Sequence, residues 1–121
     1  MSTQTRGHFD VETLRRGIEE GDADAQLSLY ADDAVVRMVD RTNPPSSPRE
    51  LHGREAIGEY VRDVCGRDMT HRVEQVVVGD DRAAFTEACE YADGTRVLCA
   101  TVLELRDGQI VNQVAVSAWD E

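Results

Sequence analysis

Apolar residues recur at helical spacing through most of the first half of the chain. Val11, Leu14 and Ile18 form the apolar stripe of a helix that Asp10 opens as an N-cap and Gly21 ends. A β-branched run, A-V-V-R-M-V, instead indicates a strand. The pattern therefore predicts helices over residues 10–20, 22–30 and 54–64, and a strand over residues 34–39.

From Thr70 onward the apolar period changes from that of helices to that of strands. Asp-Gly pairs at 93–94 and 107–108 separate β-rich runs, which is a strong short-range signal for hairpins. The segment at 41–48, R-T-N-P-P-S-S-P, contains all three prolines and excludes a helix or a central strand there. The strands predicted are residues 73–78, 83–91, 96–105 and 110–119.

This order of elements predicts a single α+β domain. Two helices, a strand and a third helix precede a four-stranded antiparallel meander. Helices arranged in this way collect on one face of a curved sheet. A chain of 121 residues has room for one domain, which we expect at residues 9–121 after a flexible N-terminus at residues 1–8.

Composition argues against several classes of partner. The chain has 24 acidic and 13 basic residues, all of the latter arginine, for a formal net charge of -11. Nucleic acids and anionic membranes need a basic surface, so neither is expected to bind. There is no apolar run of the ~20 residues that a membrane span needs, and no apolar signal-peptide centre, so we expect a cytoplasmic protein. In that compartment its three cysteines should remain reduced.

Three segments resemble the nuclear-transport-factor-2-like superfamily, and within it the small SnoaL-like and ketosteroid-isomerase-like proteins. They are G-D-A-D-A-Q-L-S-L-Y-A-D-D-A-V-V (21–36), H-G-R-E-A-I (52–57) and L-E-L-R-D-G-Q-I-V (103–111). The resemblance implies a cone-shaped fold, in which a bent antiparallel sheet wraps around N-terminal helices and leaves an internal pocket. It does not imply one reaction, because this fold carries several chemistries and also non-catalytic binders.

The catalytic positions of ketosteroid isomerases are replaced in this chain. By the resemblance, Leu14 stands where those enzymes have a tyrosine, Met38 where they have the base, and Thr101 where they have a protonated carboxyl group. None of the three can move a proton at a dienolate. A steroid Δ-isomerase mechanism is therefore not expected.

Strand parity makes Glu87 the first candidate for chemistry. If Thr101 faces inward, as the resemblance implies, then so do the alternate residues of the preceding strand, including Phe85, Glu87 and Cys89. Burial among these neighbours would disfavour the charged carboxylate, as a general acid or base requires. The alternative is a Glu87 that faces outward or pairs with an arginine.

Two further candidates are Asp40 and His71. Asp40 follows the first strand at the expected pocket mouth, although a solvated turn aspartate is the alternative. His71 opens the second strand near a point where several SnoaL-like proteins carry a pocket histidine, and its surface placement is equally open.

The inward set of the last strand depends on the turn at 107–108. A three-residue loop with Gly108 as a bulge would place Gln113, Ala115, Ser117 and Trp119 inside, and the resemblance favours this register. A two-residue turn would instead place Asn112, Val114 and Val116 there. In the favoured register Val114 and Val116 lie on the outer face, where they would suit a homodimer through the sheets.

These observations predict a cofactor-independent enzyme that isomerises, cyclises or dehydrates a small hydrophobic, oxygenated molecule. Its catalytic groups would be Glu87, His71 and Asp40. A non-catalytic small-molecule-binding protein and an interaction module are the alternatives. No metal site is expected, because the three histidines lie on separate elements without an H-x-x-x-H spacing. The expected pocket lining is Leu14, Met38, Phe85, Cys89, Tyr91, Cys99, Thr101, Gln113 and Trp119.

Overall fold

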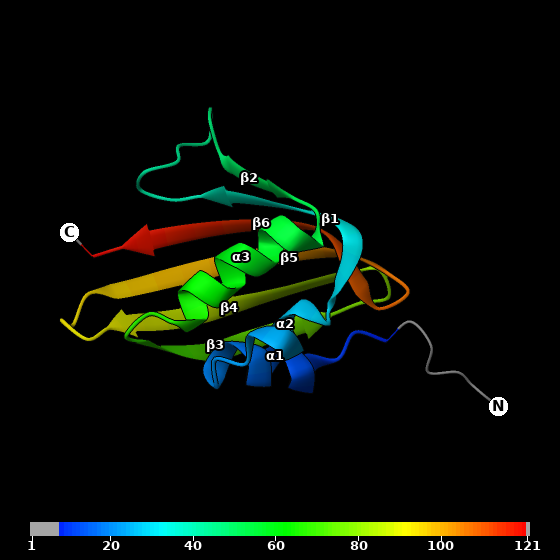
Figure 1. The fold of residues 1–121 in the computed structure, drawn as a ribbon, viewed down its shortest axis with the longest axis horizontal. Coiled ribbons are helices and arrows are strands. Elements are labelled where there is room, and N and C mark those ends of the chain that lie inside the picture. Colours follow the sequence, from blue (N-terminus) through cyan, green and yellow to red (C-terminus); the bar gives the residue numbers. More distant parts are fainter. Residues whose placement is uncertain (1–7, 121) are drawn as a thin grey trace.

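The computed structural model describes residues 8–120, so the predicted flexible N-terminus lies almost wholly outside the described residues. Within this range, helices α1 (Val11–Glu19), α2 (Ala23–Leu27) and α3 (Arg54–Cys65) pack on a six-stranded sheet (Figure 1). The strands are β1 (Tyr30–Val39), β2 (Arg49–His52), β3 (Met69–Val78), β4 (Arg82–Tyr91), β5 (Arg96–Arg106) and β6 (Gln109–Trp119). They lie side by side in the order β2-β1-β6-β5-β4-β3.

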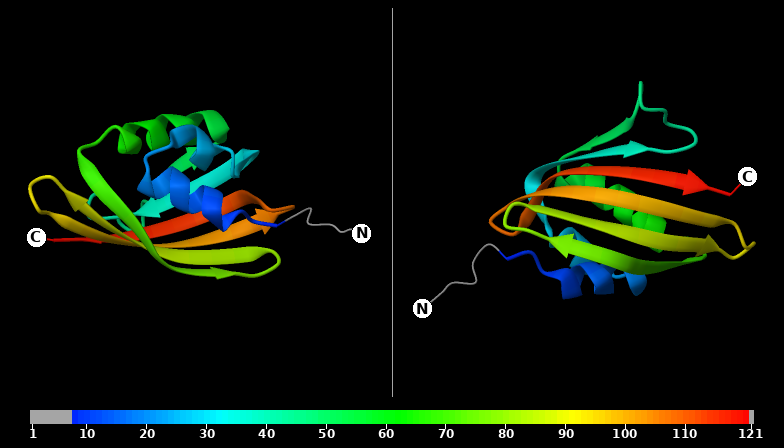
Figure 2. Two further views of the ribbon diagram at one scale, coloured as in Figure 1. Left: turned by 90° about the horizontal axis from the view of Figure 1, so that it is seen from below. Right: turned by 180° about the vertical axis from the view of Figure 1, so that it is seen from behind.

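All three helices lie over one face of the sheet, which curves toward them without closing (Figure 2). This confirms the predicted α+β class. Leu14 and Ile18 of α1 and Ile57 of α3 are buried with Leu103 of β5 in one apolar core. No helix among the described residues is long and apolar enough to cross a membrane.

The first strand begins earlier than the apolar pattern predicted. Tyr30 was expected to end the second helix, but it begins β1, so that prediction was wrong. The reason is a partner that is distant in sequence: the backbone N–H of Ile110 donates to the carbonyl of Leu29 at 2.8 Å, and Tyr30 pairs with Ile110. Because these hydrogen bonds satisfy the backbone as strand, α2 ends at Leu27.

The short edge strand β2 was not predicted. It pairs antiparallel with β1, which itself runs parallel to β6. The sequence of β2, R-E-L-H, has one apolar residue and follows Pro48, so it carries no alternating pattern. Its register brings Arg49 beside Met38 and therefore to the same end of the sheet as the turn that follows β1.

A compensating bulge determines which side chains of β6 face inward. Asp107 and Gly108 both have positive φ, 53° and 78°, and form a two-residue turn that pairs Arg106 with Gln109. The three-residue loop was therefore the wrong turn. However, the register shifts between Glu104 and Leu105, because Ile110 pairs with Leu105 and Asn112 with Glu104. The strand β6 thus has one extra residue between Ile110 and Asn112. This residue restores the alternation of inward and outward side chains that the three-residue loop would have produced, so Gln113, Ala115, Ser117 and Trp119 face the helices.

Candidate active site

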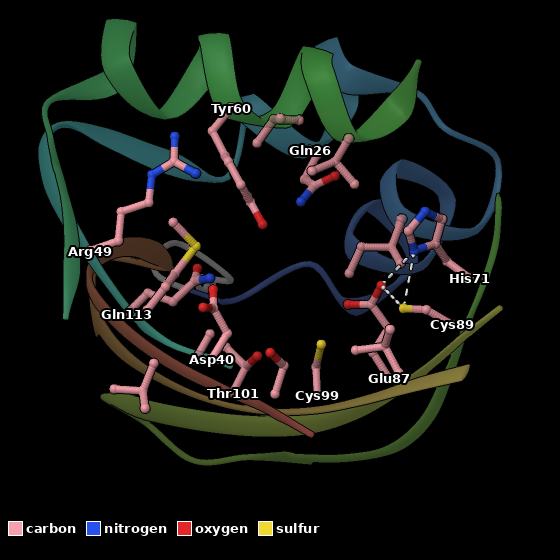
Figure 3. A pocket seen from close by; sticks show the side chains of 18 of the residues that line it. Gln26, Asp40, Arg49, Tyr60, His71, Glu87, Cys89, Cys99, Thr101 and Gln113 are labelled. Atoms are coloured by element: carbon pink, nitrogen blue, oxygen red, sulfur yellow. Dashed lines mark hydrogen bonds and ion pairs between the residues drawn. The ribbon is translucent and has the colours of Figure 1, made fainter. Parts of the chain in front are cut away.

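A cavity of about 370 Å³ lies between the concave face of the sheet and helices α1 and α3 (Figure 3). That volume suits a small organic ligand. The residues expected to act or to line a pocket all contribute to its wall: Leu14, Met38, Asp40, His71, Phe85, Glu87, Cys89, Tyr91, Cys99, Thr101, Gln113 and Trp119.

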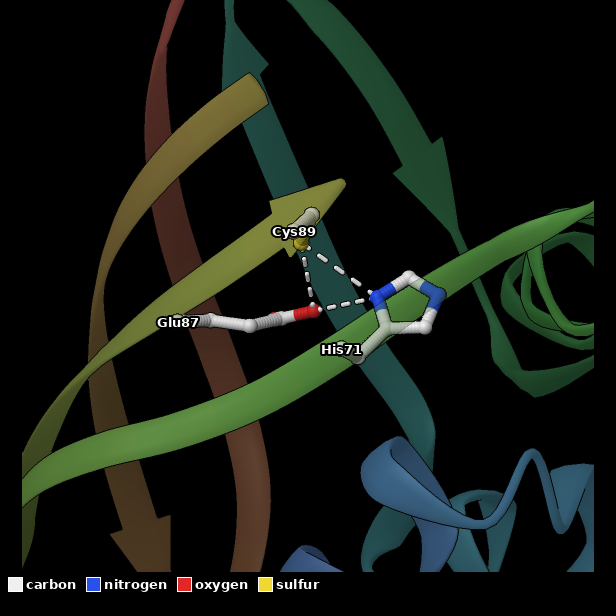
Figure 4. Close-up of side chains that lie close together, drawn as sticks. All are labelled: His71, Glu87 and Cys89. Atoms are coloured by element: carbon white, nitrogen blue, oxygen red, sulfur yellow. Dashed lines mark hydrogen bonds and ion pairs between the residues drawn. The ribbon is translucent and has the colours of Figure 1, made fainter. Parts of the chain in front are cut away.

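Three of these side chains form a hydrogen-bonded cluster, which we call the Glu87 cluster: His71, Glu87 and Cys89 (Figure 4). Glu87 and Cys89 alternate on the inward face of β4, and His71 on β3 lies opposite Cys89. Nδ1 of His71 is 2.8 Å from Oε2 of Glu87, and Sγ of Cys89 is 3.1 Å from the same oxygen. Strand parity and cross-strand register together therefore bring an imidazole and a thiol to one carboxylate.

The cluster is shielded from water and contains no arginine. The side chains of His71 and Glu87 are only 11% and 16% exposed. Both contacts fall on Oε2 of Glu87, while the other carboxylate oxygen projects toward the cavity (Figure 3). Since Nδ1 of His71 faces the carboxylate, Nε2 is the imidazole atom left for proton exchange elsewhere. Glu87 is thus neither outward-facing nor paired with an arginine, the two alternatives that its sequence position allowed.

Cys89 acts in this cluster as a protonated thiol. The neighbouring Cys99 thiol, burial and the negative charge of Glu87 together raise the pKa of Cys89 far above its usual range. The thiol therefore donates a hydrogen bond to Glu87, and at neutral pH Cys89 is a weak nucleophile.

The same three residues offer donor atoms within 4.8 Å of one another, close enough for one metal ion. The sequence argument against a metal rested on separation along the chain, and the tertiary structure removes that separation. A metal would nevertheless require the thiolate of Cys89, whose formation the surroundings disfavour, and would break the hydrogen bond between His71 and Glu87. The cluster therefore suits proton transfer better than metal binding.

Asp40 lines the cavity mouth but is engaged in a turn. Its Oδ1 accepts four hydrogen bonds, from the backbone N–H and the side chain of both Thr42 and Asn43. Burial tends to raise the pKa of Asp40, but the hydrogen bonds from Asn43 and Thr42 outweigh it and hold the pKa below its usual value. Asp40 is thus an ionised turn residue, as in the alternative left open by its sequence.

Two tyrosines that were not among the expected lining residues, Tyr30 and Tyr60, also line the cavity. The hydroxyl of Tyr30 donates to Oε1 of Gln113 at 2.6 Å, and burial raises the pKa of Tyr30 well above its usual value. Tyr60 extends from α3 toward the cavity (Figure 3), and burial raises its pKa as well. The hydroxyl of a buried tyrosine needs a polar partner. This requirement was the signal in the sequence that could have identified the two tyrosines as cavity residues.

Alkylation should report the state of Cys89 directly. In the native protein at pH 8, we expect iodoacetamide to label Cys89 and Cys99 at least about tenfold more slowly than in urea, because burial and the raised pKa of Cys89 suppress its thiolate. Glu87→Gln removes one charge that raises this pKa and should speed the labelling of Cys89. Peptide mass spectrometry measures both rates, and rapid native labelling of both cysteines would contradict the inward assignment.

Asp40→Asn should weaken the turn after β1. We expect the free energy of unfolding to fall by ~1–2 kcal/mol at pH 7, because charge-assisted hydrogen bonds become neutral ones. A depressed pKa in the folded state contributes stability above the ordinary aspartate pKa of ~3.9, and this contribution is lost as pH falls through the lower folded value. Urea unfolding of both proteins at pH 7 and pH 3 should show the difference shrinking at low pH. The control Asp33→Asn changes an exposed residue on the same strand and should have little effect.

Comparison with known proteins places this chain in a family. Residues 11–113 match the SnoaL-like domain family. No curated protein matches the chain. An NTF2-like protein of unknown function from Mesorhizobium loti has a similar structure, with a TM-score of 0.76 and 23% identity over 89% of each chain.

Two further solved structures are similar. A candidate ketosteroid isomerase from Kribbella flavida has a TM-score of 0.71 and 18% identity over 92% of this chain and 75% of that one. A candidate polyketide cyclase from Sinorhizobium meliloti has a TM-score of 0.66 and 19% identity over 87% of this chain and 91% of that one. At these identities the similarity concerns the fold. With the family match over most of its length, the chain belongs to the SnoaL-like domain family, and it shares the fold of the NTF2-like protein.

Proposed function

We propose that this protein is a cofactor-independent enzyme that moves a proton on a small hydrophobic, oxygenated substrate, in an isomerisation, cyclisation or dehydration. The observation that carries the proposal is the 2.8 Å hydrogen bond between His71 and Glu87 in the wall of the cavity. A carboxylate held by a histidine, with its second oxygen directed at a ligand cavity, is arranged as a general base.

In this mechanism Glu87 accepts the substrate proton on the oxygen that faces the cavity. His71 and the Cys89 thiol keep the other oxygen in place, so the carboxylate does not have to reorient when substrate binds. Glu87 then returns the proton to another atom of the substrate or to a leaving oxygen. Asp40, already saturated on Oδ1 by its turn, serves at the mouth as a fixed negative charge rather than as a proton carrier.

Gln113 is placed to bind a substrate oxygen. Tyr30 donates to Oε1 of Gln113, which leaves the amide nitrogen as a donor in the cavity wall. A donor of this kind stabilises the negative charge that develops on a carbonyl oxygen when a neighbouring carbon loses its proton. The Tyr30–Gln113 pair therefore complements the base supplied by Glu87.

A second candidate is a binding protein without chemistry. In the described part of the chain, every buried side-chain nitrogen or oxygen has a hydrogen-bond partner. A cavity that leaves no fully buried polar group unsatisfied can hold an apolar ligand without reacting with it. The kinetic test below separates the two candidates.

The test uses 5-nitrobenzisoxazole, an apolar, oxygenated probe whose ring opens when a base removes one proton from carbon. We expect the protein to accelerate this reaction, and Glu87→Gln to lower kcat/KM by ~10²-fold or more. Glu90→Gln is the matched control, since it makes the same change three residues along β4 on an exposed side chain. Trp119, the chain's one tryptophan, lines the cavity, so quenching of its fluorescence reports binding.

The outcomes distinguish the two candidates. Equal turnover by Glu87→Gln and the wild type would remove Glu87 from the mechanism. Quenching of Trp119 without any acceleration of ring opening would favour the binding protein.

We also propose that two copies of the chain associate through the outer face of the sheet. Exposed apolar residues lie side by side there, with Val102 opposite Val114 and Ala100 opposite Val116. Neighbouring positions on β4 are also small and uncharged. An apolar patch of this kind can pack against the same patch of a second copy, as the contact of a twofold dimer requires. The patch comprises Ala84, Thr86, Ala88, Leu98, Ala100, Val102, Val114, Val116 and Ala118.

A single charge should disrupt this association. At micromolar concentration, light scattering should report about twice the 13.4 kDa chain mass, and Val116→Glu should reduce it to one chain. Val78→Glu is the control, because Val78 is an exposed valine at the end of β3 that pairs with the buried Ala83, outside the patch. A wild-type protein that scatters as a monomer would contradict the proposal.

A further inference from the structure

Arginines gather at one end of the cavity. Arg41, in the turn after β1, Arg49, at the start of β2, and Arg67, after α3, all contribute to the cavity wall. They come from three segments that are far apart in sequence. Their convergence is unexpected in a chain with a formal net charge of -11, where most cavity surfaces would be expected to carry acidic groups.

Two of these arginines have no carboxylate partner within residues 8–120: Arg41 and Arg49. In the same part of the chain, only Arg62, outside this cavity, shares that property. The arginines with an acidic partner within 4.0 Å are Arg15, Arg16, Arg37, Arg54, Arg67, Arg72, Arg82, Arg96 and Arg106. With acidic residues in excess, a pair of unmatched cations beside the cavity calls for an explanation.

Aromatic rings hold both guanidinium groups at the mouth. The guanidinium carbon of Arg41 lies 4.1 Å from the centre of the Trp119 ring, and that of Arg49 lies 5.1 Å from the centre of the Tyr60 ring. Tyr91 stacks on Trp119, with ring centres 5.6 Å apart, and so supports the first of these contacts. Contact with a ring occupies the flat face of a guanidinium and leaves its in-plane N–H donors available.

The two acidic groups in the cavity wall each have one oxygen hydrogen-bonded to residues other than Arg41 and Arg49. Oδ1 of Asp40 is taken by Thr42 and Asn43, and Oε2 of Glu87 by His71 and Cys89. Arg67 pairs with Asp63 at 2.7 Å and donates to the hydroxyl of Tyr91. The charges of Arg67 and Asp63 therefore cancel. At the mouth, Arg41 and Arg49 carry two positive charges and Asp40 carries one negative charge, and the resulting net charge of +1 matches a monoanion.

We propose that the substrate is a hydrophobic carboxylate, whose anionic group binds Arg41 and Arg49 at the mouth while its apolar body enters the cavity toward Glu87. The guanidinium fork matches the two oxygens of a carboxylate. As an identification of the substrate, this inference rests on the proposed function. As a statement about binding, it can be tested without any turnover.

The test compares 2-naphthoate with 2-naphthamide, which have the same rings and differ in charge. By calorimetry we expect the wild type to bind the carboxylate at least about tenfold more tightly than the amide, with the preference decreasing as salt is added. Arg41→Gln/Arg49→Gln should bring the ratio close to one without changing the affinity for the amide. Arg41→Lys/Arg49→Lys keeps the charge and should recover part of the preference.

Arg62→Gln is the matched control, because it removes an arginine that likewise lacks an acidic partner but lies outside the cavity; it should retain the wild-type ratio. Equal affinity of the wild type for the two probes, no measurable binding of 2-naphthoate, or an unchanged ratio in the double glutamine variant would overturn the inference. A carboxylate preference that needs the two arginines, together with full turnover by Glu87→Gln, would uphold this site and reject the proposed mechanism alone.

Discussion

The helices cover only part of the concave face of the sheet, and both the core and the cavity depend on that limited cover. Leu14 and Ile18 of α1 and Ile57 of α3 bury their apolar surface against the middle of the sheet. Toward the ends of β4 and β6 no side chain fills the remaining space, and a cavity of about 370 Å³ results. The curved sheet therefore encloses the apolar core where the helices cover it and leaves the cavity where they do not.

A carboxylate inside such a cavity has to be stabilised locally, because the helices exclude most of the water from it. The structure provides this with the imidazole of His71 and the thiol of Cys89, both directed to one oxygen of Glu87. The cationic side chains stand apart at the mouth, against Trp119 and Tyr60. Neither Arg41 nor Arg49 pairs with Glu87 in the described part of the chain, so the carboxylate and these cations do not neutralise one another.

Where the local sequence pattern predicted a structure different from the observed one, pairing between strands distant in sequence determined the structure. Tyr30 joined a strand because Leu29 and Ile110 share a backbone hydrogen bond. The inward residues of β6 were predicted correctly from the wrong turn, since a bulge beyond the two-residue turn restored the parity. Strand β2 had no apolar alternation to reveal it, yet its pairing with β1 is what brings Arg49 to the cavity.

The sequence by itself determined the fold class, because helical and strand periods and Asp-Gly turns are local properties of a chain. Once the family resemblance implied that Thr101 faces inward, strand parity placed Glu87 and Cys89 on the same face. Only the tertiary structure decided that His71 is hydrogen-bonded to Glu87 and that Asp40 accepts the hydrogen bonds of a turn. It also decided that Arg41 and Arg49, from different segments, line the same cavity. Such contacts depend on the register between strands and on side-chain direction, and both are set by hydrogen bonds between segments far apart in the sequence.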